Sequence, residues 1–133
     1  MVIRVLASIA CAALLGAAAP PPAQGLEGNW RNTKNSIHLK VQACGPALCG
    51  TVTWAADKQR EKARKGSGRD LLGAQLLTGL KRARDGSWQG KVFLPAANVH
   101  GTATVRQVND STIEVSGCTL MGLLCKTQHW HRF

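Results

Sequence analysis

The chain contains no tyrosine, only two phenylalanines and few acids, since 7 Asp and Glu accompany 17 Lys and Arg. It also lacks a G-x-S-x-G segment, and no serine has an evident His and Asp setting, which argues against an esterase-type nucleophile. The carboxylates are scattered in turns and loops and indicate no glycosidase pair. We therefore predict a protein without catalytic activity or catalytic residues. An unrecognised hydrolase ranks third, after the two binding functions described below.

Long apolar runs are also scarce, and the one present lies at the N-terminus. Residues 5–19 are apolar or small apart from Ser8, follow Arg4, and precede three prolines and Ala23-Gln24-Gly25. This order is typical of a secretory signal peptide, and a run of about 15 residues is shorter than the roughly 20 that a spanning helix needs. We predict a cleaved signal peptide over 1–25, a single domain over 26–133, and a periplasmic or secreted protein.

Four cysteines follow this segment, and none forms the C-x2-C pair typical of structural zinc sites. An even number of cysteines in a small exported domain indicates two disulfides, for which three pairings are possible. If the flanking segments are strands, side-chain alternation places both cysteines of each local pair on one face of a hairpin. We therefore favour Cys44–Cys49 and Cys118–Cys125.

A period of two in hydrophobicity, typical of half-buried strands, is the main pattern after residue 25. It covers residues 36–43, 48–54, 88–94, 99–108, 112–117 and 126–132, after a short opening strand at 29–31. Residues 75–82 fit a strand or one helical turn, and no strong amphipathic helix follows the signal peptide. We predict an all-β domain, a small antiparallel barrel or sandwich of about seven or eight strands.

Residues 56–70 break this pattern, because they contain no aliphatic residue larger than alanine and six basic residues. We predict a long, exposed, mobile loop. It either binds polyanions, such as lipopolysaccharide or anionic lipid headgroups, or only keeps the domain soluble. The absence of interleaved aromatic residues disfavours nucleic acid. The candidate anion-binding residues are Lys58, Arg60, Lys62, Arg64 and Lys65.

A small barrel either holds one apolar ligand or is filled by its own side chains. The alternation predicts the following inward-facing, ligand-binding residues: Trp54, Trp88, Val92, Val105 and Val115. His129 and His131 share a strand face, but we interpret them as exposed histidines and predict no metal and no cofactor. Outward positions such as Ser36 and Lys40 are polar, which excludes a membrane-spanning barrel with its apolar outer band.

Several fragments in a fixed order resemble one bacterial family, the domain of unknown function 2147. They are Gly28-Asn29-Trp30, Leu48-Cys49-Gly50, residues 69–73, residues 88–95 and the closing residues 129–132. The resemblance implies a secreted or periplasmic β domain and supplies no activity and no catalytic residues. The chain departs from the usual pattern at residues 96–101.

The opening Gly-x-Trp and an arginine on the last strand are similar to the calycin and lipocalin signature. The similarity implies that Arg132 lies over Trp30 and closes one barrel end through a cation–π contact; alternatively, Trp30 is a core residue and Arg132 a surface one. We predict an exported envelope module that binds a small ligand or partner in its barrel, with polyanion binding through the basic loop as the alternative.

Overall fold

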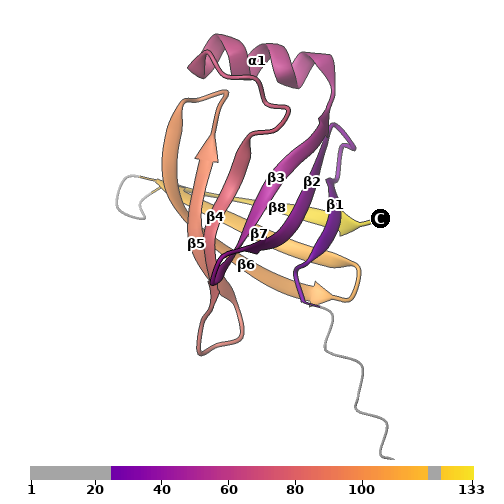
Figure 1. The fold of residues 1–133 in the computed structure, drawn as a ribbon, viewed down its shortest axis with the longest axis vertical. Helices are drawn as coiled ribbons and strands as arrows, with labels where there is room; N and C mark the ends of the chain where they lie inside the picture. Colours follow the sequence, from indigo (N-terminus) through magenta and orange to yellow (C-terminus); the bar gives the residue numbers. More distant parts are fainter. Residues whose placement is uncertain (1–24, 120–123) are drawn as a thin grey trace, which may run out of the picture.

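The chain folds as an eight-stranded antiparallel barrel with one helix across one end (Figure 1). The computed structural model describes residues 25–119 and 124–133, so nearly all of the predicted signal peptide lies outside the described residues. Neighbouring strands pair in chain order, and β1 pairs with β8 to close the barrel. The strands are β1 (Gly28–Asn32), β2 (Ile37–Cys44), β3 (Ala47–Ala55), β4 (Gln75–Arg82), β5 (Trp88–Leu94), β6 (Val99–Asn109), β7 (Thr112–Thr119) and β8 (Leu124–Arg132).

The all-β prediction is therefore confirmed, and of its two forms the barrel is the one observed. The ambiguous segment 75–82 is strand β4. Both predicted disulfides are present, with Cα atoms 5.8 Å apart in Cys44–Cys49 and 4.1 Å apart in Cys118–Cys125. Each one links the two strands of a single hairpin, at opposite ends of the barrel.

The prediction of a mobile loop over 56–70 is wrong, because Asp57–Ser67 forms a helix, α1. Its ends carry the usual signals: Asp57 lies in the first turn, and Gly68 ends the helix at a φ of 74° with its N–H bonded to the carbonyl of Arg64. A Glu61–Lys65 ion pair of 3.0 Å joins successive turns. The helix buries only Ala63, which is why the apolar pattern failed to reveal it.

Trp54 does not point into the barrel, contrary to the prediction. The register shifts between His38 and Leu39, which face Trp54 and Val52, so Thr53 is an extra residue on β3. Such a bulge reverses the side-chain alternation beyond it. Trp54 is consequently 45 % exposed on the outer surface, where its ring lies 4.7 Å from that of His38.

The barrel end opposite α1 is closed around Trp30, which is fully buried. The Arg132 guanidinium lies 4.2 Å from the centre of the Trp30 ring, the first of the two arrangements considered from the sequence. It also donates hydrogen bonds to the carbonyls of Gly25, Glu27 and Asp110 at 2.8–3.0 Å. Arg132 thus ties the start of β1, the β6–β7 turn and the end of β8 together.

We predict that Arg132→Met lowers the free energy of unfolding by about 2 kcal/mol, because it removes charge-assisted hydrogen bonds and the cation–π contact together. Urea denaturation measures this change. Arg132→Lys keeps the charge but loses the forked set of N–H donors, so its free energy of unfolding should lie between those of the wild type and Arg132→Met. The matched control is Arg106→Met, whose side chain makes a single exposed contact of 3.5 Å with Asp85 and should matter far less. Equal losses in Arg132→Met and Arg106→Met would contradict the role given to Arg132.

Candidate ligand-binding cavity

The half of the barrel beneath α1 is hollow. A cavity of about 420 Å³ lies there, lined by the inward side chains of Leu39, Leu77, Val92, Val115 and Trp130. Aliphatic and aromatic groups form most of its wall, so water inside it would have few hydrogen-bond partners. The cavity is therefore suited to an apolar guest.

The other half of the barrel is filled by its own side chains. Val105 and Leu80 are almost completely buried there, and Trp88 packs against the same core with Arg82 stacked 5.3 Å from its ring. Of the five interior residues predicted from the sequence, Val92 and Val115 line the cavity, Trp88 and Val105 belong to the filled core, and Trp54 lies outside. Periodicity gives the face of a residue but not its depth along the barrel.

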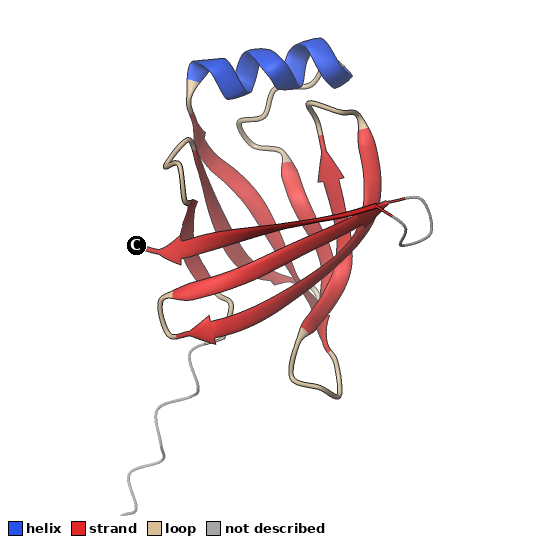
Figure 2. Cartoon of the chain, turned by 180° about the vertical axis from the view of Figure 1, so that it is seen from behind, coloured by secondary structure: helices blue, strands red, loops and turns tan. Residues whose placement is uncertain are grey.

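Helix α1 and the segment that follows it roof the cavity. Figure 2 shows the helix lying across the open end of the strands. Gln59, Ala63 and Leu71 line the cavity from this side, and Leu71 and Ala63 are buried. These residues were missed from the sequence because the region was interpreted as a loop; the N-terminal Asp57 and the glycine after the last turn are the signals that could have revealed the helix.

Two contacts hold α1 over the cavity. A Cβ atom on Gly66 would overlap the carbonyl group of Ala96, so the helix backbone lies directly against the β5–β6 turn at a place where only glycine fits. Arg60 forms a two-pronged ion pair with Asp70, with a shortest distance of 2.7 Å. Hydrogen bonds from Arg60 and from the Leu72 N–H lower the pKa of Asp70 to about 2.

All five predicted anion-binding residues lie on α1. Lys65 forms an ion pair with Glu61, and Arg60 forms one with Asp70. Lys58, Lys62 and Arg64 are exposed, and no ion pair links them to other described residues. The basic segment is thus a structured helix with three available cations at the cavity end of the barrel.

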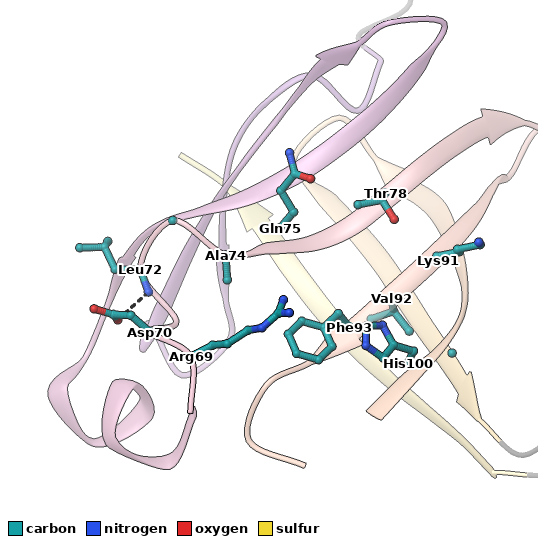
Figure 3. Close-up of a pocket in the computed structure, with 12 residues that line it drawn as sticks. Arg69, Asp70, Leu72, Ala74, Gln75, Thr78, Lys91, Val92, Phe93 and His100 are labelled. Carbon is teal, nitrogen blue, oxygen red and sulfur yellow. Dashed lines mark hydrogen bonds between the residues drawn. The ribbon is translucent and has the colours of Figure 1, made fainter. Parts of the chain in front are cut away.

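A second hollow, of about 470 Å³, lies on the side of the barrel beside the residues that follow α1 (Figure 3). Arg69 reaches over the Phe93 ring at 5.4 Å, and His100 stacks on Phe93 with ring centres 4.5 Å apart. Lys91 and Gln75 complete a polar wall. This recess differs from the cavity in its more polar wall, which includes Arg69, Asp70 and Lys91.

The histidines considered as ligands do not form a metal site within the described part of the chain, where no three His, Cys, Asp or Glu side chains are grouped suitably. His129 lies 3.6 Å from Glu114, and His131 lies near Thr33 and Thr112. His38 forms a hydrogen bond with Asn35 at 2.7 Å, and its ring contacts those of Trp54 and Phe133 in a tilted arrangement. In residues 25–119 and 124–133, no helix has the length and apolar character needed to cross a membrane.

Comparison with known proteins places this barrel in a family. Residues 28–132 match the family model described as "Uncharacterized protein conserved in bacteria (DUF2147)". The chain belongs to this family. The family resemblance noted from the sequence is therefore confirmed, and the match includes both disulfides and the Trp30–Arg132 pair. Disulfides of this kind are typical of an oxidising compartment outside the cytoplasm.

A similar solved structure carries the description "Protein HP1028 from the human pathogen Helicobacter pylori belongs to the lipocalin family". Its TM-score with this chain is 0.67 at 16 % sequence identity, over 82 % of this chain and 83 % of that one. At this identity the similarity concerns the fold alone, and it agrees with the calycin and lipocalin resemblance of the sequence. Among curated proteins, none matches this chain.

Proposed function

We propose that this protein is a non-enzymatic binding module of the bacterial envelope, periplasmic or secreted, whose barrel holds one small apolar molecule under α1. The observation that carries the proposal is the cavity of about 420 Å³, because its size lies within the roughly 300–1,000 Å³ range of ligand pockets and its wall is mostly apolar. The disulfides and the signal-peptide pattern support the location.

The shape of the interior also supports ligand binding. A barrel of eight strands has room either for its own side chains or for one small ligand. In this chain, side chains such as Leu80 and Val105 fill the end closed by Trp30, whereas at the other end side chains such as Leu77, Val115 and Trp130 surround a hollow. The space inside this wall has room for a ligand of modest size.

We predict that Val115→Phe weakens binding of the neutral apolar fluorophore N-phenyl-1-naphthylamine at least tenfold, because the larger ring occupies the cavity. Fluorescence titration of the purified protein measures the affinity. The matched control is Val108→Phe, the same change at a position that is 57 % exposed on β6, which should bind the fluorophore as the wild type does. A thermal melt of each variant checks that it is folded. Wild-type protein that leaves the fluorophore unbound would refute cavity binding.

A second candidate function is binding to anionic surfaces, such as lipopolysaccharide or acidic lipid vesicles, through the outer face of α1. It is favoured by one observation: the available cations Lys58, Lys62 and Arg64 lie on the helix that covers the cavity. Attraction of this kind weakens as salt increases. Binding inside an apolar cavity is far less sensitive to salt, so ionic strength separates the two functions.

We predict that replacing Lys58, Lys62 and Arg64 together by glutamine reduces low-salt binding to anionic vesicles while leaving the melting temperature nearly unchanged, since exposed charges contribute little to stability. Co-sedimentation with vesicles measures the binding. A control variant with glutamine at Lys34, Lys40 and Lys81, which are also exposed, has the same net charge and should bind as the wild type does. If both variants lose binding equally, net charge and not α1 is responsible; if the wild type does not bind, this second function fails.

A further inference from the structure

The wall of the cavity carries a single charge, which is positive. Among the described residues that line the cavity, Lys126 is the only charged one. All seven Asp and Glu residues of the sequence lie in the described part of the chain, and none of them lines the cavity. The cavity therefore combines an apolar wall with one positive group and no negative side chain to neutralise it.

The register of β7 and β8 explains why this lysine faces the cavity. Ile113 pairs with Trp130, both buried, and Gly117 pairs with Lys126, which lies four residues before Trp130 on β8. Side chains four apart on a strand lie on the same face, so Lys126 shares the inward face of Trp130. Its charge remains at the mouth, where the side chain is exposed to solvent.

The residue opposite Lys126 has no side chain. A Cβ atom on Gly117 would lie only 3.3 Å from Cγ1 of Val92, so Gly117 faces the interior and its backbone lies close to the Val92 side of the cavity wall. The Lys126 ammonium group lies at the rim of this apolar cavity and has no ion-pair partner among the described residues. A ligand with a negative head and an apolar tail would complement both features.

We propose that the ligand is a single-chain acidic amphiphile, whose alkyl tail occupies the cavity and whose carboxylate or other anionic headgroup binds the Lys126 ammonium. This inference rests on the proposed function, since it specifies the ligand of the same cavity. The polar recess around Arg69 and Lys91 is another cationic site near this end of the barrel, in addition to the cations of α1, and the experiment separates the recess from Lys126.

The experiment measures displacement of N-phenyl-1-naphthylamine by decanoate and by decanol, which have the same chain length and differ in the charge of the head. At low salt and pH 7.5, the wild type should prefer decanoate about tenfold, as expected for a charged hydrogen bond that is partly shielded from water. Lys126→Met should lose this preference and keep its affinity for decanol. Retained binding of decanol also shows that the variant is folded.

Two further variants make the test specific. Lys126→Glu should prefer decylammonium over decanoate, because the charge at the mouth is reversed. Lys91→Met removes a cation from the polar recess and should leave the preference for decanoate unchanged. Loss of the preference in Lys91→Met but not in Lys126→Met would overturn the proposal in favour of the recess.

The failure of this inference differs from the failure of the proposed function. If decanol and decanoate displace the fluorophore equally from the wild type, the cavity binds apolar chains but Lys126 does not select an acidic head. If neither displaces it, and the fluorophore itself does not bind, the cavity is not a binding site and both proposals fail.

Discussion

The contact between Arg132 and Trp30 determines which end of this barrel is closed. The guanidinium lies over the buried indole and donates hydrogen bonds to the backbone carbonyls of Gly25, Glu27 and Asp110. The last strand is therefore fixed to both the start of the first strand and the β6–β7 turn. The indole N–H in turn donates to the carbonyl of Leu26 at 2.8 Å. Because these bonds satisfy the polar groups at this end, the core can be filled with large side chains here, and any ligand has to enter from the other end.

The remaining features follow from having one closed end. The cavity lies at the opposite end, where leucines, valines and Trp130 form most of its wall. Helix α1 covers it with little apolar surface of its own, and is held instead by the close contact of Gly66 with the β5–β6 turn and by the Arg60–Asp70 pair. A cover with few buried side chains is easier to displace than a packed core element, which is consistent with access for a ligand.

Most of the fold could be predicted from the sequence. The alternation of polar and apolar residues indicates the strands, and the positions of the cysteines indicate which two pairs of strands form disulfide-linked hairpins. The errors have physical causes. One extra residue at Thr53 reversed the face of Trp54, and a bulge leaves no reliable mark on hydrophobic periodicity. Helix α1 buries only Ala63, so the signals left in the sequence were Asp57 in the first turn and Gly68 after the last turn. The candidate site was predicted only in part. Val92 and Val105 have the same pattern in sequence, but Val92 lies in the hollow half of the barrel and Val105 in the filled half.

The central claim is that the half of the barrel beneath α1 accepts an apolar chain while the other half is filled. Methyl-labelled NMR spectra recorded during a titration with decanol test it most directly, because valine methyl groups report on both halves. The account predicts large shift changes for Val92 and Val115, which line the cavity, and small ones for Val41 and Val105, which lie in the filled core. Changes confined to the exposed Val108, or no saturable change at any methyl group, would contradict it.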